Sequence, residues 1–471
     1  MRRTAWILAL TAAVVGAAAA AGVYWWLCLD EPQWTTRSPA ALEEFLAGFE
    51  NRSKQYFYDA AVSFERALEL DPDFAAARLY LGTLFQGRAE RQQCFDELRR
   101  VDLDALTPRE RFLVRHGLAL HDGEIERAGE LVRSYLAEHP EDPFGIRAEC
   151  DLLWEAQSWD EAEACYRRLL KLQPNWVEAQ DRLGYIALAR GRFADAEEQF
   201  LVYRYLAPDQ AGPYRSLASL MLLLGRYEET EEAISEALRI KPDFCEAYPL
   251  EVRLRVLTGE PERALEALDE FAAIPTCAYF HERGYFCAMR VWITYHRGDP
   301  EAAWELASGE CREQLEKTEP VIVHRIAAMT GRWAEADWME EALGMRLAEA
   351  RELKKPLWAK YYIAITAHAR GVRLMASGHL ERAAERFREA DERLDYWVPE
   401  LASFKLFNRL HLLRMLELLE RDEEAAALLA EIDAVNPRAV EGFRIPDLET
   451  LRKPAERSVA RSPWERGESS D

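Results

Sequence analysis

The chain has 471 residues and a formal net charge of −23, with 60 lysine and arginine residues against 83 aspartate and glutamate residues. An acidic surface repels phosphates, and the sequence contains no basic stripe with interleaved aromatic residues, so the composition argues against nucleic-acid binding. With 49% hydrophobic and 30% charged residues, the chain can bury a sizeable core and keep a well-solvated exterior.

The first feature along the chain is an uncharged stretch of 26 residues, 4–29, preceded by Arg2 and Arg3 and followed by Asp30. At ~1.5 Å per residue a helix of this length reaches ~39 Å, enough to cross a hydrocarbon core of ~30 Å. Trp25 and Trp26 lie at its far end, where aromatic rings favour the membrane interface. We therefore predict a transmembrane signal-anchor helix at 4–29, with residues 1–3 cytoplasmic and the remainder extracytoplasmic.

Two alternatives remain open for this stretch. It is rich in alanine, and Ala19-Ala20-Ala21 offers the small residues that a signal peptidase requires, so a cleaved signal peptide is the first alternative. The second is an apolar helix buried within the main fold. Residues 30–40 are expected to form a linker from this stretch to the folded part.

Residues 41–278 repeat with a period of 34 residues, in seven blocks without insertions. Position 20 of each block is small and position 24 is apolar. Two antiparallel helices approach closely only where one presents a small residue, so the period predicts stacked helix pairs. Glycines at position 15 and prolines at position 32 are expected to end the two helices. The residues at positions 20 and 24 are Ala60 and Phe64, Cys94 and Leu98, Ala128 and Val132, Ala162 and Tyr166, Ala196 and Phe200, Thr230 and Ile234, and Ala264 and Leu268.

This pattern resembles the tetratricopeptide repeat family. The clearest match consists of Leu183, Gly184, Gly191, Phe193, Ala196, Phe200 and Pro208. The resemblance implies an all-α fold, an α-solenoid of antiparallel helix pairs that follows the right-handed superhelix of that family. The family's tryptophan is absent, and the block that begins at Ala75 departs furthest, with Leu106 in place of the closing proline.

Beyond residue 278 the phase slips, and residues 279–437 are expected to form degenerate helix pairs of the same kind. The stretch 351–360 is interpreted as either a lengthened helix or a loop. Residues 438–471 are polar and are expected to be disordered. The degenerate pairs are drawn around Gly298 with Ala303, Gly331 with Ala336, Gly371 and Gly378 with Ala383, Phe387 and Ala390, and Ala425 with Leu429 and Pro437.

The eight cysteines are not expected to form a disulfide framework. Cys28 lies in the apolar stretch, which leaves an odd number of cysteines in the repeats. Cys94 and Cys150 occupy small-residue positions, where a compact buried side chain explains them. Cys277 and Cys287 flank the phase break and are the candidate pair in an oxidising compartment.

No motif for chemistry is present. The nine histidines are scattered without the spacing of a helical zinc site, and no nucleophile elbow or phosphate-binding glycine loop occurs. The repeats also leave no region for a catalytic domain. We therefore predict no enzymatic activity, no cofactor and no metal.

The resemblance implies a binding surface instead. In tetratricopeptide repeat proteins the first helix of each pair lines a concave groove, which would bind another protein or a peptide segment. Carried over block by block, the resemblance implicates Arg147, Asp151, Trp154, Asp181, Tyr185, Arg215, Ser219 and Arg253.

The leading functional hypothesis is a non-catalytic, membrane-anchored scaffold that mediates protein–protein interaction on the extracytoplasmic face, in cell-envelope assembly or secretion. The 51 arginines against 9 lysines favour a GC-rich bacterial genome, and therefore an inner-membrane protein whose repeats lie in the periplasm. The alternative is a sensor or regulatory module that acts with a signalling kinase or transcription regulator. Nothing in the sequence names the partner.

Overall fold

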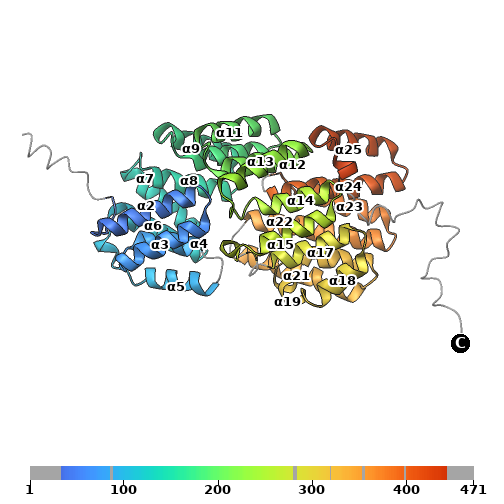
Figure 1. Ribbon diagram of the computed structural model, residues 1–471, viewed down its shortest axis with the longest axis horizontal. Coiled ribbons are helices and arrows are strands. Elements are labelled where there is room, and N and C mark those ends of the chain that lie inside the picture. Colours follow the sequence, from blue (N-terminus) through green and yellow to red (C-terminus); the bar gives the residue numbers. More distant parts are fainter. Residues whose placement is uncertain are drawn as a thin grey trace, which may run out of the picture.

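The computed structural model describes residues 33–84, 88–278, 280, 284–318, 320–352, 356–396 and 399–442. Every regular element within these residues is a helix, and consecutive helices pack as antiparallel pairs along a curved solenoid (Figure 1). This confirms the predicted all-α solenoid. The anchor predicted at 4–29 lies outside the described residues. Among the residues that are described, none of the helices combines the length and apolar character needed to span a bilayer.

Seven helix pairs follow the 34-residue period. The first helices of the pairs are α2 (Pro39–Ser53), α4 (Ala75–Leu84), α6 (Pro108–His121), α8 (Pro143–Glu155), α10 (Val177–Ala189), α12 (Ala211–Leu223) and α14 (Tyr248–Leu257). The second helices are α3 (Phe57–Leu70), α5 (Arg88–Leu98), α7 (Ile125–Glu138), α9 (Trp159–Leu172), α11 (Phe193–Leu206), α13 (Tyr227–Ile240) and α15 (Pro261–Ala272).

The remaining helices continue the solenoid with less regular lengths. They are α17 (Tyr285–His296), α18 (Pro300–Ser308), α19 (Arg312–Thr318), α20 (Pro320–Met329), α21 (Trp333–Glu352), α22 (Pro356–Ala376), α23 (Leu380–Asp391), α24 (Pro399–Leu418), α25 (Asp422–Val435) and α26 (Ala439–Gly442). Short 3-10 turns occupy Leu103–Ala105 and Pro275–Cys277.

In three pairs the two helices meet where a glycine of the first faces a phenylalanine ring of the second. A Cβ placed on Gly184 would lie 2.2 Å from Cε1 of Phe200, so only glycine fits there. Gly371 faces Phe387 in the same way, with the corresponding distance at 2.6 Å. This confirms the close approach expected from the period, and it shows that α22 and α23 form a repeat of the same geometry.

Of two expectations for the C-terminal helices, the lengthened helix considered at 351–360 agrees with the structure, and the placement of Leu429 needs correction. In the stretch 351–360, α21 ends at Glu352 and α22 begins at Pro356, so two long helices meet there. In the last pair Leu429 does not fill the interface, because its side chain is 36% exposed. Ala425, Leu428 and Ile432 are buried instead.

The linker expected at 30–40 is part of the packed structure from residue 33 onward. Trp34 is buried and contacts the rings of Phe45 and Phe144, with ring centroids 4.7 and 5.4 Å apart. The hydroxyl of Thr36 donates a hydrogen bond to Asp71 at 2.5 Å. These contacts fix the chain entering α2 against the first four repeats.

The chain doubles back, so that its last helices pack against its middle repeats. Side chains of α8–α12 and α20–α25 share one hydrophobic core, and α24 contacts α12 directly. Figure 1 shows the orange-red α24 close to the green α12. Arg438 forms an ion pair with Glu228 at 3.0 Å and lies over the ring of Tyr227. Residues 438–442 of the predicted tail are thus described, whereas 443–471 lie outside the described residues.

The described residues form three disulfide bonds, whereas the sequence analysis named one candidate pair. Each one closes a single helix pair, with Cα–Cα distances of 5.3–5.5 Å. The expectation that Cys277 pairs with Cys287 is wrong, and so is the expectation that the cysteines form no framework. The odd count misled because Cys94 stays free and buried. The bonds are Cys150–Cys165, Cys245–Cys277 and Cys287–Cys311.

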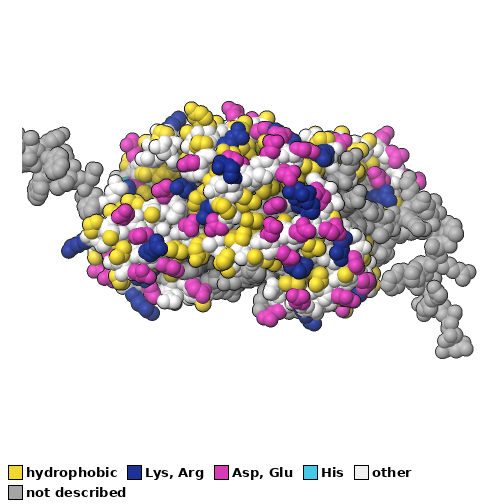
Figure 2. All heavy atoms as spheres, in the orientation of Figure 1, with side chains coloured by type: hydrophobic (Ala, Val, Ile, Leu, Met, Phe, Trp, Pro, Cys, Tyr) yellow, Lys and Arg dark blue, Asp and Glu magenta, His cyan; other side chains and the backbone are white. Residues whose placement is uncertain are grey.

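The surface view agrees with the acidic composition. Figure 2 shows carboxylates distributed over this face of the molecule, with lysine and arginine side chains scattered singly among them. No basic stripe of the kind that tracks a nucleic-acid backbone is visible on this face.

Replacing Gly184 with alanine should destabilise the fold by roughly 1–3 kcal/mol, because the added Cβ has to displace the Phe200 ring in a packed interface. Gly344 provides the matched control. It lies within α21, and a Cβ there meets nothing within 4 Å, so Gly344→Ala should stabilise by about 0.5–1 kcal/mol. Urea denaturation of both variants measures the difference, and equal stabilities would contradict the close-approach model.

Candidate functional site

The predicted groove residues lie on the first helices of four successive pairs, α8, α10, α12 and α14. The structure joins most of them through a network of charges and hydrogen bonds on the inner side of the solenoid. The network has two connected parts, one around Arg147 and one around Asp181.

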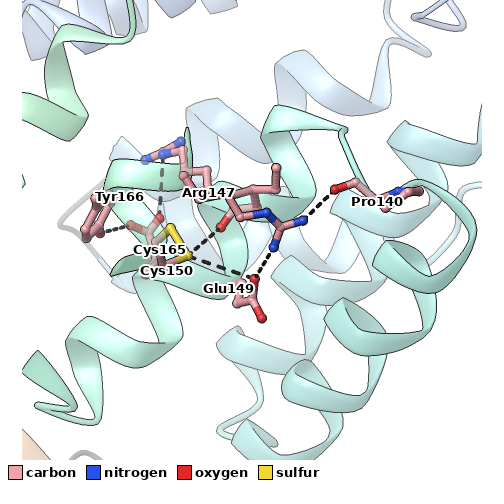
Figure 3. Close-up of a disulfide and its surroundings, with 9 residues drawn as sticks. Pro140, Arg147, Glu149, Cys150, Cys165 and Tyr166 are labelled. Carbon is pink, nitrogen blue, oxygen red and sulfur yellow. Dashed lines mark hydrogen bonds and ion pairs between the residues drawn. A yellow bond between two sulfur atoms is a disulfide. The ribbon is translucent and has the colours of Figure 1, made fainter. Parts of the chain in front are cut away.

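The first part of the network is centred on Arg147. Its guanidinium approaches Glu178 on the next first helix at 3.2 Å and Asp151 one turn along α8 at 3.6 Å. Arg52 from the end of α2 approaches the same Glu178 at 3.7 Å. The Tyr166 hydroxyl donates to Asp151 at 2.8 Å, and Figure 3 shows Arg147 and Tyr166 beside the Cys150–Cys165 bond that joins α8 to α9.

Burial and charge compete at Glu178. Burial would raise the pKa of its carboxyl, but Arg147 and Arg52 outweigh that effect and bring the pKa down to about 2. Arg147 responds in the opposite sense: burial would lower its pKa, and Glu178 with Asp151 raises it. Both groups therefore stay ionised at neutral pH, and each holds the other in place.

The second part of the network is centred on Asp181. The Ser216 hydroxyl donates to its carboxylate at 2.6 Å, and the Tyr185 hydroxyl lies 3.4 Å from the Ser216 hydroxyl. Arg215 donates to the Tyr185 hydroxyl at 3.0 Å. Burial raises the pKa of Asp181, although Arg215 and the Ser216 bond oppose this. Ser219 completes the row by donating to the backbone carbonyl of Arg215 at 3.0 Å.

The turn between α2 and α3 inserts into this second part. Gln55 donates to Asp181 at 3.3 Å and accepts from Arg215 at 2.6 Å. The Tyr56 hydroxyl accepts from the backbone N–H of Ala211 at 3.1 Å. Asp181 and Arg215, both predicted to contact a partner, are thus hydrogen-bonded to the first helix pair of the same chain. Sequence reasoning missed this contact because 126 and 160 residues separate Gln55 from its two partners.

The predicted residues differ in how accessible they are. Trp154 and Tyr185 are 6% and 5% exposed, so their rings pack between neighbouring helices rather than standing open in a groove. Arg182 lies over the Trp154 ring at 4.7 Å. Asp181 and Ser219 are also buried, whereas Arg147, Asp151, Arg215 and Arg253 are partly exposed. Nη1 of Arg253 is buried without a hydrogen-bond partner among the described residues.

The network is locally cationic in an acidic protein. It contains Arg52, Arg147, Arg182 and Arg215 against Asp151, Glu178 and Asp181, which is four positive charges against three negative ones. Arginine presents donors in a planar fork that suits carboxylates. The partly exposed arginines could therefore bind an acidic side chain or a chain terminus of another protein.

A second polar cluster lies in the C-terminal half and was not expected from the scattered histidines. Nδ1 of His368 lies 2.9 Å from the side-chain oxygen of Asn408, and its Nε2 lies 3.3 Å from Arg325. The His411 ring is 5.1 Å away. Burial, with a smaller contribution from Arg325, lowers the pKa of His368 to about 3, so this imidazole is neutral at pH 7.

The histidine cluster does not resemble a metal site. Within the described ranges, no three His, Cys, Asp or Glu side chains gather as a cation site requires. The contacts of His368 and Asn408 instead bridge α20, α22 and α24, and Asn408 also donates to the backbone carbonyl of Phe387 at 2.9 Å. The cluster satisfies buried polar groups in the second half of the solenoid.

Paired helices, an inner charge network and 34-residue blocks define a helical-repeat binding protein. Residues 148–213 match the sequence model of the tetratricopeptide repeat family, so the chain carries tetratricopeptide repeats, as the period predicts. A stretch of 73 residues is 44% identical to protein O-mannosyl-transferase Tmtc2 of Drosophila melanogaster. That match covers 15% of this chain and only 8% of the relative, whose named activity is not carried over by so short a stretch.

Solved structures with similar folds are distant in sequence. A tetratricopeptide repeat protein from Parabacteroides merdae is 17% identical over 59% of this chain and 94% of its own, with a TM-score of 0.35. PilF of Pseudomonas aeruginosa is 16% identical over 51% of this chain and 96% of its own, with a TM-score of 0.29. These similarities concern the fold, and nothing about a partner follows from them.

The contact between the first hairpin and the groove can be tested with glycine at position 55. Gln55 and Gln157 occupy the same block position with φ of 65° and 56°, a conformation that favours glycine. Gln157→Gly should therefore stabilise by about 0.5–1 kcal/mol. Gln55→Gly relieves the same strain but loses both side-chain bonds, with a net loss of roughly 1–3 kcal/mol.

Hydrogen exchange and urea denaturation measure these effects. Gln55→Gly should accelerate exchange in α10 and α12, which its side chain clamps, whereas Gln157→Gly should leave both helices protected. Equal stabilisation by the two variants, with unchanged exchange in α10 and α12, would show that the clamp contributes nothing.

Proposed function

We propose that this protein is a non-catalytic scaffold that binds another protein through the inner side of its repeats, held at a membrane by residues 4–29 with the repeats on the extracytoplasmic face. The observation that carries the proposal is the helix-pair solenoid, which occupies nearly all of the described chain and presents an inner surface built from successive first helices. Tetratricopeptide repeats of this kind act as protein-binding scaffolds.

The binding surface that we propose is the partly exposed rim of the charge network. Its members are the arginines and the carboxylate that keep accessible surface: Arg147, Asp151, Arg215 and Arg253. Trp154, Asp181, Tyr185 and Ser219 lie behind this rim and support it. A partner with carboxylate side chains would contact the arginines, and it would compete with Gln55 for Arg215.

The disulfide bonds support the extracytoplasmic placement. Disulfides persist in oxidising compartments and are rare in a reducing cytosol. By loop-closure entropy, loops with sequence separations of 15, 32 and 24 contribute about 3–4 kcal/mol each. Three such bonds would be lost in the cytosol. An envelope location is also consistent with roles in cell-envelope assembly or secretion.

A photo-crosslinking amino acid at position 151 should capture a protein partner in intact cells, because the Asp151 side chain is 41% exposed on the rim. The same probe at Asp160, 78% exposed at the start of α9, is the control on the outer side. Replacing Arg147 and Arg215 together with glutamate should reduce the capture at position 151 by tenfold or more, on the order of 1.4 kcal/mol.

Identical crosslinks at positions 151 and 160 would contradict an inner binding surface. If the captured protein is a signalling kinase or a transcription regulator, the result would favour the alternative hypothesis of a regulatory module over the scaffold.

The compartment is tested by mapping the cysteines. If the repeats are extracytoplasmic, alkylation before lysis should leave all three bonds intact, and non-reducing peptide mapping should recover each of them. The same chain without residues 1–32 should be retained in the cytosol with its cysteines reduced, which provides the control. Full alkylation of Cys150, Cys165, Cys245 and Cys277 in the full-length protein would place the repeats in a reducing compartment.

A further inference from the structure

The segment that precedes α2 is bound by the first repeats in the way that a peptide is bound. Residues 33–36 are not helical, and they pass the beginning of α6. The hydroxyl of Thr107 donates to the backbone carbonyl of Gln33 at 3.2 Å, and its N–H donates to the Thr35 hydroxyl at 3.1 Å. The backbone N–H of Thr35 donates to the Glu110 carboxylate. Two of these three hydrogen bonds use the backbone of the segment, so another extended sequence could form them too.

A tryptophan side chain fixes the segment in an aromatic pocket. The Trp34 ring is 8% exposed, and it lies against the edges of Phe45 on α2 and Phe144 on α8. The Arg109 guanidinium lies 5.7 Å from the centroid of the Trp34 ring and donates to the side-chain oxygen of Gln33 at 2.9 Å. Aromatic edges and a cation around one buried ring form a pocket that favours an aromatic side chain.

The Glu110 carboxylate requires a backbone donor from the segment. Its side chain is 0% exposed, and its hydrogen bonds come from the backbone N–H groups of Thr35 and of Ala76, the latter at 3.3 Å. Burial raises the pKa of this carboxyl, and the hydrogen bonds from Thr35 and Ala76 oppose that effect. A buried carboxylate that lacks donors is costly. Without residues 33–36 the site would therefore lack a donor that any peptide backbone other than proline supplies.

We propose that the beginnings of α6 and α8, together with Phe45 of α2, form a peptide-binding site, and that residues 33–36 are its intramolecular occupant. The ligand is an extended peptide with an aromatic side chain, followed by a residue that keeps its backbone N–H. A partner segment of this chemistry binds when residues 33–36 leave the site. The segment is thus an internal competitor that keeps the site closed until such a partner displaces it.

The size of the contact suits a competitor that can be displaced. One buried ring and a few hydrogen bonds hold the segment without a covalent link, and Gln33 and Arg37 are exposed. A tethered segment acts at an effective concentration on the order of millimolar, so the tether compensates for a weak contact. The site uses none of the rim residues Arg147, Asp151, Arg215 and Arg253, and the proposal does not depend on the function proposed above.

Peptide binding to the full-length chain tests this site. The probe is an acetylated peptide of residues 33–38 with a fluorescent label at its carboxyl end, and fluorescence anisotropy is the readout. Trp34→Ala empties the aromatic pocket, so this variant should bind the peptide roughly tenfold or more tighter than the unchanged chain, where the tethered segment competes. Leu46→Ala, at a side chain of α2 that is 50% exposed, is the control and should bind like the unchanged chain.

An intact disulfide map shows that each variant is folded. If Trp34→Ala does not fold, Trp34→Leu gives the same comparison, because leucine keeps part of the apolar contact with Phe45 and Phe144. Peptide binding by the unchanged chain that is as tight as binding by a folded Trp34 variant would overturn the proposal, and so would the absence of binding to both.

Changes in the peptide separate specific recognition from nonspecific adsorption. Alanine in place of its tryptophan should weaken binding tenfold or more. N-methylation of Thr35 in the peptide removes the N–H that Glu110 accepts and should weaken binding by about tenfold. N-methylation at Arg37, which is exposed in the chain, should preserve binding. Equal binding of all four peptides would contradict the site. None of these measurements involves the rim of the charge network, so their failure would leave the proposed function untouched.

Discussion

The close approach of the two helices within a pair is the contact on which this structure depends, and in three pairs it places a glycine against a phenylalanine ring. Gly184 under Phe200 and Gly371 under Phe387 set the distance between the two helices of their pairs. A single pair cannot bury both faces of its helices. Each pair is therefore stable only when the next pair packs against its exposed apolar face. In the fourth pair the same position is Cys150, and a covalent bond to Cys165 ties the helices where other pairs rely on packing.

The curvature that follows from stacking brings distant repeats together, and charged residues meet where the solenoid closes on itself. Burying Arg147 and Glu178 costs desolvation, which their mutual attraction and their further partners offset. Removing one partner of such a group leaves a buried charge uncompensated, so the network constrains the arrangement of α2, α8, α10 and α12 more than it adds net stability. The Gln55 turn completes it by satisfying Asp181 and Arg215 at once.

The features that could be predicted from the sequence are those set by residues within one 34-residue block. Small residues at position 20 and apolar residues at position 24 are readable because both helices of a pair lie within one block. The disulfides carried a readable signal as well: Cys150 and Cys165 fall on facing positions of one block, and Cys245 and Cys277 fall at its two ends. Counting cysteines obscured this, since one buried thiol, Cys94, makes the total in the repeats odd.

Contacts between repeats that are far apart left no such signal. Nothing in the local sequence of Gln55 indicates Asp181 or Arg215, because these neighbours depend on the accumulated rotation of several pairs. The burial of Trp154 and Tyr185 has a nearer origin, since their rings contact Trp159 and Phe200 of their own pairs and side chains of the next pair. The block alignment places the predicted residues on the first helices, and packing within and between pairs decides which of their side chains stay accessible.

Inner and outer faces of this solenoid are consequently under different constraints. On the inside, many polar side chains are already hydrogen-bonded or ion-paired to other parts of the same chain. A partner therefore has to compete with Gln55 or bind the partly exposed rim of the charge network. On the outside, neighbouring second helices leave positions 25 and 26 in solvent, and those positions are polar unless something else covers them. Leu201 and Val202 depart from that rule on a helix whose inner face is already filled by Phe200 and Tyr203. The free energy cost of exposing them falls on the isolated chain and would be relieved by a surface that covered them.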